Sequence, residues 1–317
     1  MLLLHKKVKN LRKTIITLVS ALFLLICLSA GYQNAYAGAD VPSLVETEWL
    51  AENLQKEELR IIYIAAMSPG DKQNFDAKHI PGALYLDIGS FMNVLGNGSA
   101  PPDKAKFEAL MGRLGISNDT NVVVLSKGGG NPFIASALWL MEYFGHEKIC
   151  YLNGGMAKWN KEGRQTTGAP AKINPAVFKA SPNPSILATA DYVLKNLRNP
   201  KVVIVDARGK GEYDGTQNVG QNKRTGHIPG AINLNFYPTN LNNDGTFKSV
   251  KELKAVYEAK GVTKDKEIIS YCQGGVRAAN TYFVLKHLLG YPEVRNYVGS
   301  WGEWGNRLDP ARYPLEK

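Results

Sequence analysis

The stretch EIISYCQGGVRAANTYFVLKHLLG, residues 267–290, decides the fold class. Its first part, Glu267 to Tyr271, is a short apolar run rich in isoleucine, which is typical of a buried strand. From Ala278 to Leu289 the apolar residues follow a helical period, and Gly290 is a usual helix stop. A glycine-rich turn that begins at Cys272 joins the two. The stretch therefore predicts a strand, turn and helix, the unit of a mainly parallel sheet.

The same pattern occurs twice in the chain. Residues 121–125 predict a strand that is followed by a helix at residues 133–144 and by Gly145. The motif HIPGA at residues 79–83 recurs 148 residues later, and NGGMAKW at residues 153–159 aligns with VGSWGEW 145 residues later. Such repetition indicates two copies of one domain. The sequence thus predicts an α/β fold with two domains, each a mainly parallel sheet flanked by helices.

The N-terminal residues predict a signal peptide. A basic stretch from Lys6 to Lys13 precedes the apolar residues 14–30, and Ala35-Tyr36-Ala37 offers the small residues that a signal peptidase needs. We expect cleavage after Ala37 and export, to the periplasm in a bacterium, with no membrane contact after cleavage. The alternative is an uncleaved membrane anchor, because the 17 apolar residues fall just short of the ~20 that span a bilayer. Lipidation at Cys27 is not expected, since Ile26 stands where a lipoprotein site needs a small residue.

Removal of this leader changes both length and charge. The 280 residues that remain suggest about two domains. We place the leader at residues 1–37, the first domain at 38–164, a proline-rich linker at 165–186 and the second domain at 187–317. Because the leader holds five basic and no acidic residues, the 38 basic residues fall to 33 against 28 acidic ones, and the net charge falls from +10 to +5. The lysines are scattered beside acidic residues, so we expect no nucleic-acid partner.

Cys272 is the candidate nucleophile. A thiol on a short turn before a helix lies among backbone N–H groups at the positive helix end, which favours the thiolate. The alternative is a buried structural cysteine. Two glycines and Arg277 make a poor core neighbourhood for one.

The motifs VDAR at residues 205–208, EYDG at 212–215 and GHIPGA at 226–231, together with the loop CQGGVR, resemble the rhodanese family of sulfurtransferases. The resemblance implies that Cys272 takes a sulfane sulfur from a donor, becomes a persulfide and passes the sulfur to a thiophilic acceptor. Related phosphatases have five residues between cysteine and arginine. The loop here has four, from Cys272 to Arg277, which favours sulfur over phosphate. No cofactor and no metal ion is expected.

The resemblance also implies a set of substrate-binding residues around the nucleophile. They are Gln273, Gly274, Gly275, Val276, Arg277 and Arg208, with Arg224 as a further candidate. A guanidinium at Arg277 could hold a dianionic donor through two hydrogen bonds. Alternatively, Arg277 forms a salt bridge to Asp206 or Glu212 and braces the loop. Gly274 and Glu212 stand where thiosulfate-type enzymes carry basic residues, so donor identity stays open between thiosulfate and 3-mercaptopyruvate.

The first copy lacks the reactive residue. Its strand runs into SKGGGNP, residues 126–132, so Ser126 or Lys127 faces the Cys272 position and neither can carry sulfur. Residues 61–76 also lack a counterpart of the VDAR motif. The chain thus resembles tandem sulfurtransferases whose first domain is inactive.

Three further residues have alternative interpretations. His79 and His227 occur in both copies, so we expect them to bond nearby backbone and not to act as general bases. Cys150 lies in a predicted strand and could pair with Cys272 in a disulfide or leave it free, and the loop features favour a free thiol.

The expected function is transfer of sulfur from thiosulfate to cyanide or a thiol. A non-catalytic carrier that stores sulfane sulfur on Cys272 is the alternative of another class. The expected partners are a small anionic donor and a thiophilic acceptor. The sequence gives no oligomeric state.

Overall fold

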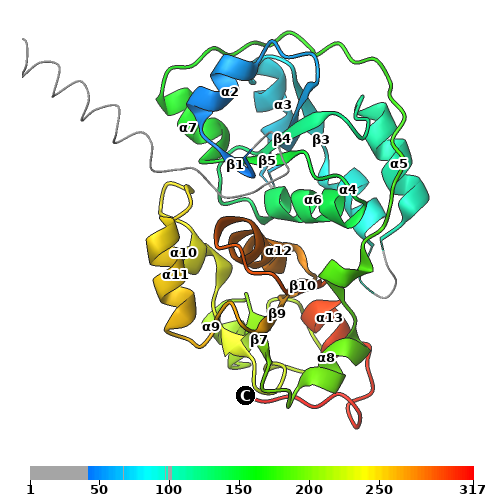
Figure 1. Cartoon of the computed structure of the whole chain (residues 1–317), viewed down its shortest axis with the longest axis vertical. Coiled ribbons are helices and arrows are strands. Elements are labelled where there is room, and N and C mark those ends of the chain that lie inside the picture. The colour runs from blue at the N-terminus through cyan, green and yellow to red at the C-terminus, as the bar shows by residue number, and fades with distance from the viewer. Residues whose placement is uncertain (1–41, 67, 97, 99–101) are drawn as a thin grey trace, which may run out of the picture. The chain divides into compact units, whose positions relative to one another are not determined.

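The computed structural model describes residues 42–317, apart from residues 67, 97 and 99–101 (Figure 1). The leader predicted at residues 1–37, its cleavage site and Cys27 therefore lie outside the described residues. Within the described part of the chain, no helix combines the length and the apolar composition needed to cross a bilayer.

The first half of the chain forms a five-stranded sheet in the order β1-β5-β4-β2-β3, and every neighbouring pair of strands is parallel. Its strands are β1 (Leu44–Val45), β2 (Leu59–Ile64), β3 (Ala83–Leu86), β4 (Asn121–Leu125) and β5 (Ile149–Leu152). Its helices are α2 (Thr47–Asn53), α3 (Asp71–Ala77), α4 (Ile88–Leu95), α5 (Lys104–Arg113), α6 (Pro132–Tyr143) and α7 (Gly155–Lys161). Helices connect the strands because parallel neighbours need a crossover.

The second half repeats this topology, with the order β6-β10-β9-β7-β8 and only parallel pairs among its described strands. Its strands are β6 (Leu187–Ala188), β7 (Val202–Asp206), β8 (Ile232–Asn233), β9 (Glu267–Tyr271) and β10 (Val294–Tyr297). Its helices are η1 (Pro184–Ile186), α8 (Ala190–Asn196), α9 (Lys210–Tyr213), α10 (Phe236–Asn240), α11 (Val250–Glu258), α12 (Val276–Phe283), η2 (Val284–Leu288) and α13 (Ser300–Trp304). The predicted fold class, two α/β domains with parallel sheets, is confirmed.

The helix after β9 differs in detail from the prediction. It begins at Val276, two residues earlier than expected, because Gly275 takes a left-handed conformation (φ 77°) that lets the chain turn directly into the helix. After Phe283 the helix widens to a π-helix, in which the N–H of Leu289 donates to the carbonyl of Val284. The strand predicted at residues 267–271 has the observed bounds of β9.

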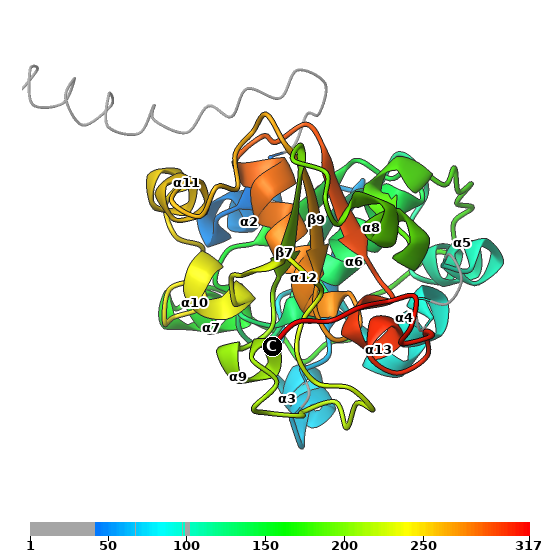
Figure 2. The ribbon, with the colours of Figure 1, turned by 90° about the horizontal axis from the view of Figure 1, so that it is seen from below.

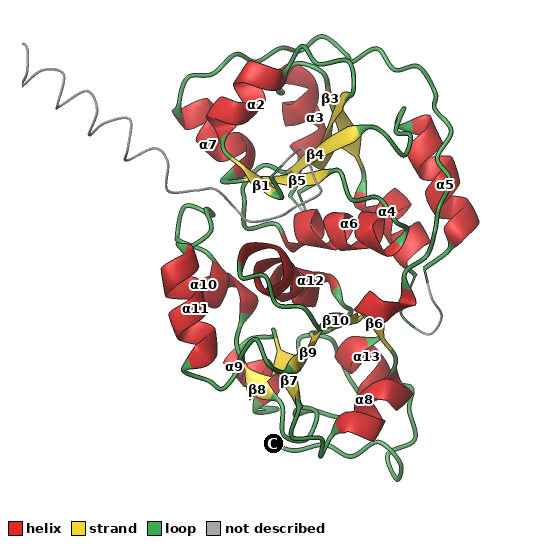
Figure 3. Ribbon diagram, viewed as in Figure 1, coloured by secondary structure: helices red, strands yellow, loops and turns green. Residues whose placement is uncertain are grey.

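Helices α6 and α12 pack against each other between the two sheets (Figures 2 and 3). One apolar cluster includes Ile134 and Trp139 of α6 together with Ala279 and Phe283 of α12. Glu142 adds a polar bridge: it accepts hydrogen bonds from Tyr282 and from the His287 ring, each at 2.9 Å. The two halves therefore share a core.

The proline-rich segment between the sheets has an irregular backbone over most of its length. Residues 165–183 contain no described helix or strand apart from a β-bridge between Thr167 and His79. The segment lies against the first half of the protein. The N–H of Ala176 donates to the carbonyl of Gly112, and the N–H of Ser181 donates to the carbonyl of Phe144. The exact limits of the leader, domains and linker remain predictions.

Candidate active site

Cys272 lies where the prediction puts it, directly after β9 and before α12. Its side chain is 1 % exposed and packs with Ala207, Ala278 and the partly buried Phe236. Its apolar neighbours limit hydration of the sulfur. Gly274, two residues further on, is exposed and has no atom within 4 Å of the position that a Cβ would take.

The loop from Cys272 to Gly275 is held at both ends by one side chain. The Oγ of Ser300 accepts hydrogen bonds from the N–H of Cys272 at 3.0 Å and of Gly275 at 2.9 Å. The carbonyl of Cys272 accepts from the N–H of Trp301 at 2.9 Å. Gly275 cannot be replaced without movement, since a Cβ there would lie 2.7 Å from the Cα of Val298.

The other N–H groups of the loop are available to an anion. In the described part of the chain, the N–H groups of Gln273 and Gly274 have no protein acceptor. At the start of α12, the N–H of Ala279 donates to the carbonyl of Gly275. The preceding N–H groups of Val276 and Arg277 have no such acceptor among the described residues and are also open. Together with the positive end of α12, these groups can stabilise a thiolate or a persulfide anion.

Arg277 is paired with Glu212. Its two terminal nitrogens donate to the two carboxylate oxygens at 2.6 and 2.9 Å. Burial alone would raise the pKa of Glu212, but the hydrogen bonds and charge of Arg277 outweigh it and hold that pKa below its ordinary value. Burial lowers the pKa of Arg277, and the contacts with Glu212 and Cys272 reverse this to a net rise. This geometry favours the bracing interpretation of Arg277 and selects Glu212 over Asp206.

Arg208 and Arg224 are engaged by other protein groups. Arg208 is 1 % exposed and ion-paired with Asp206 at 2.6 Å, and it stacks on the Trp301 ring at 4.7 Å. Arg224 donates to the backbone carbonyls of Tyr313 and Trp304. Both arrangements favour a structural role over contact with a donor, and the predicted substrate contact of Arg208 stays a prediction.

The side chains of Gln273 and Val276 contact other parts of the protein. The Gln273 amide exchanges two hydrogen bonds with Asn222, at 2.8 and 3.1 Å. Val276 packs on the shared core. Any contribution of these two residues to substrate binding therefore rests on their backbone N–H groups.

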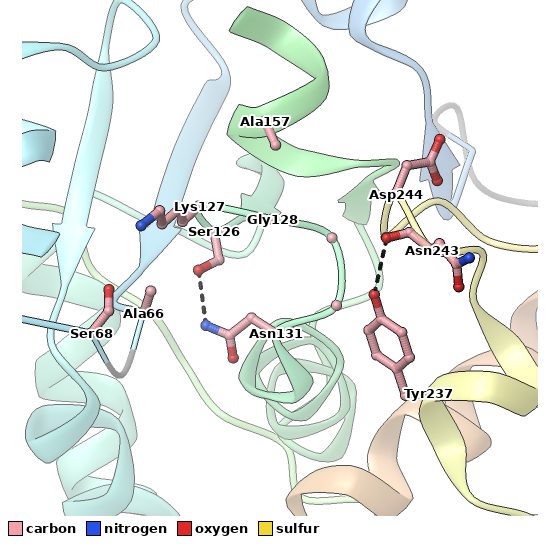
Figure 4. Close-up of a pocket in the computed structure, with 13 residues that line it drawn as sticks. Ala66, Ser68, Ser126, Lys127, Gly128, Asn131, Ala157, Tyr237, Asn243 and Asp244 are labelled. Atoms are coloured by element: carbon pink, nitrogen blue, oxygen red, sulfur yellow. Dashed lines mark hydrogen bonds between the residues drawn. The ribbon is translucent and has the colours of Figure 1, made fainter. Parts of the chain in front are cut away.

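The first domain carries a different loop in the same place. Ser126 is the counterpart of Cys272, because its carbonyl accepts from Met156 as that of Cys272 accepts from Trp301, at 2.9 Å in both. Six residues separate β4 from α6, against four between β9 and α12. The Ser126 hydroxyl accepts a hydrogen bond from Asn131 at 2.8 Å (Figure 4). A pocket of 510 Å³ opens beside this loop, and Lys127 and Tyr237 are among its lining residues.

The histidines and Cys150 have the structural roles that the sequence favours. His79 and His227 bond the carbonyls of Phe75 and Tyr213 at 2.7 and 2.9 Å, which confirms the backbone contacts expected of both. Cys150 and Cys272 are both free thiols, so the alternative of a disulfide between them is not realised. Cys150 is fully buried, and burial raises its pKa to about 12. No group of three or more His, Cys, Asp or Glu side chains among the described residues is placed to hold a metal ion.

Two residues of the site are missed by the sequence reasoning, namely Ser300 and Asn222. The repeat held a signal for Ser300, which aligns with Gly155 of the first copy and replaces a glycine in a turn. Asn222 lies in the loop between α9 and β8, where the sequence gives no such signal.

Comparison with known proteins identifies relatives over most of the chain. The family model for the rhodanese-like domain matches residues 46–162 and 189–307. Thiosulfate sulfurtransferase of Mus musculus is 38% identical over 285 residues, which cover 84% of this chain and 93% of the relative. The sulfur carrier protein TtuD of Thermus thermophilus is 39% identical over 290 residues, covering 86% and 95%. The crystal structure of SseA from Escherichia coli, a 3-mercaptopyruvate sulfurtransferase, aligns with a TM-score of 0.70 and 30% identity and covers 82% of this chain and 99% of that one.

Proposed function

The chain belongs to the rhodanese family of sulfurtransferases, and we propose that it moves a sulfane sulfur from thiosulfate to cyanide or a thiol through a persulfide on Cys272. One observation carries this proposal. Cys272 lies at the N-terminus of α12 in a four-residue loop with open N–H groups, whereas the equivalent position in the first domain holds Ser126.

The chemistry proceeds in two displacements. The Cys272 thiolate attacks the outer sulfur of thiosulfate, the S–S bond of the donor breaks, and sulfite leaves with the electron pair. The product is a persulfide anion with the charge of the original thiolate. Cyanide then attacks the outer sulfur, thiocyanate departs, and the thiolate is restored. Neither step needs a proton, so the site requires no general base, which agrees with the backbone contacts of the two histidines.

The loop residues stabilise charge and do not themselves react. We infer that the open backbone N–H groups of Gln273, Gly274, Val276 and Arg277 face the sulfur and favour its anionic forms. Arg277 holds α9 against α12 through Glu212 and so fixes the loop. Glu212 neutralises the charge of Arg277, so the loop offers little net positive charge to favour thiosulfate, a dianion. 3-Mercaptopyruvate therefore remains the alternative donor.

The carrier alternative keeps a specific support, since one relative is named a sulfur carrier protein. The two functions differ in turnover. An enzyme cycles many times with thiosulfate and cyanide, whereas a carrier accepts one sulfur and releases it only to its partner. Export of the mature protein, to the periplasm in a bacterium, is part of the proposal and rests on the predicted leader at residues 1–37.

Intact mass spectrometry tests the mechanism. Thiosulfate should add the mass of one sulfur atom to the protein, and cyanide should remove it. Cys272→Ser should abolish this addition, and Cys150→Ala should retain it because Cys150 is buried in β5. Sulfur that still loads onto the Cys272→Ser protein would overturn the mechanism. Steady-state formation of thiocyanate then separates the enzyme from the carrier.

A further inference from the structure

Ser300 has an unusual backbone for its residue type. It takes a left-handed backbone conformation (φ 50°), which residues other than glycine rarely adopt, and it is fully buried. At the aligned position of the first domain the chain uses a glycine, Gly155, at φ 60°. A glycine adopts this conformation without steric cost. The second domain thus keeps a conformationally costly residue where the first does not.

The contacts of the Ser300 hydroxyl show what is gained. The oxygen accepts from the N–H of Cys272 and of Gly275, and the hydroxyl donates to the carbonyl of Tyr297 at 2.6 Å. A hydroxyl has one donor and two acceptor sites, and all three are in use. The two N–H groups belong to the first and last residues of the loop.

No such anchor fits in the first domain. A Cβ at Gly155 would lie 2.7 Å from the carbonyl oxygen of Ser126 and 3.1 Å from the carbonyl carbon of Gly128. The longer loop there occupies the space that the Ser300 side chain has in the second domain. The hydroxyl is thus present in the domain whose loop carries a cysteine, Cys272, and absent from the domain whose loop carries none.

We propose that Ser300 is a positioning residue for the sulfur-carrying thiol. Its hydroxyl holds both ends of the loop by accepting from the N–H groups of Cys272 and Gly275, so that the loop keeps the shape in which the other N–H groups are open to an anion on Cys272. Backbone strain that persists at a functional site fits this role. The proposal rests on the proposed function of Cys272 as the persulfide carrier.

Alkylation tests the proposal without sulfur transfer. The rate at which iodoacetamide modifies Cys272 is measured against pH and read from the tryptic peptide Glu267–Arg277. Ser300→Gly removes the hydroxyl but relieves the backbone, so a purely structural role predicts an unchanged profile. We expect its midpoint to rise by about one pH unit and thiosulfate loading at neutral pH to slow about tenfold, the worth of one hydrogen bond. Ser300→Ala should give the same rise in the alkylation midpoint. It should also lower the melting temperature, because alanine must adopt the same unfavourable left-handed backbone conformation without the hydrogen bonds of the hydroxyl.

Ser270→Ala is the matched control. Ser270 is equally buried and lies in β9 beside the loop, but its hydroxyl donates to the carbonyls of Ala278 and Arg295 and accepts no loop N–H. Its alkylation midpoint should equal that of the wild type. A midpoint that stays or falls in both Ser300 variants would overturn the positioning role. If the wild type takes no sulfur from thiosulfate while Ser300→Gly still shifts the midpoint, the proposed function fails and the positioning role stands.

Discussion

The loops at Ser126 and Cys272 occupy the same place in two copies of one fold, yet only the second holds a thiol. The strand order, the parallel pairing and the backbone contact after the strand are the same in both. The loops differ in the residue that follows the strand, in length, six residues against four, and in the residue at the turn beneath, Gly155 against Ser300. The duplicated fold supplies a helix N-terminus in both copies, but reactivity depends on the few residues that shape the loop.

Moving the thiol between the copies is the most severe test of this comparison. The double variant Ser126→Cys, Cys272→Ser should take up no sulfur from thiosulfate, because the first loop is longer and Asn131 already contacts the side chain at position 126. Intact mass after incubation with thiosulfate measures this. Ser126→Ala alone should leave turnover within about twofold of the wild type, since one unneeded hydrogen bond is lost. Sulfur loaded on the introduced cysteine would show that loop shape matters less than we infer.

The two glycines of the active loop should respond very differently to alanine. Gly275→Ala places a Cβ at φ 77° and 2.7 Å from Val298, so we expect a loss of about 1–3 kcal/mol in the free energy of unfolding and at least tenfold slower sulfur loading. Gly274→Ala meets open space and should load sulfur at close to the wild-type rate. Denaturant unfolding measures the free energy of unfolding of each variant, and loading reactions quenched at set times measure the rate of sulfur uptake. Equal behaviour of the two variants would contradict the loop geometry.

Arg277→Lys decides between bracing and donor binding. A lysine cannot reproduce the two hydrogen bonds to Glu212, so we expect a loss of about 1–2 kcal/mol in stability and turnover that falls alike with thiosulfate and 3-mercaptopyruvate. If Arg277 instead grips a dianionic donor, the variant should stay stable and its KM for thiosulfate should rise about tenfold or more. Steady-state kinetics with both donors beside thermal melting distinguishes the two outcomes.

The Glu212 and Arg277 pair should also make stability depend on pH. Because the folded state holds the pKa of Glu212 below its ordinary value, the pair stabilises the protein above about pH 4.5, and this contribution is lost as pH falls through the lowered folded pKa. The difference in melting temperature between the wild type and Glu212→Gln should therefore be constant above about pH 5 and shrink at lower pH. A difference that does not change down to pH 3, about one and a half units below the ordinary value, would exclude this ion pair as a stabilising contact.

The sequence predicted the parts of the site that depend on local pattern and left open those that depend on tertiary contact. The strand before Cys272 and the helix after it follow from apolar periodicity. Whether Arg277 faces Asp206 or Glu212 does not, because both carboxylates lie far from it in sequence. Likewise, only the backbone contacts identify Ser126, and not Lys127, as the counterpart of Cys272, since the loops differ in length and any alignment must place a gap.

The core shared by α6 and α12 explains why a domain without the thiol would persist. Each half also has an apolar cluster of its own, but the cluster around α6 and α12 is shared, so a chain cut between the sheets would expose the packed faces of these two helices to water. The two halves should consequently fold and melt as one cooperative unit. Selection on the first copy would then act on its shape and not on its reactivity. Changes in the first loop would then be tolerated more readily than changes on the surface of α6 that packs against α12.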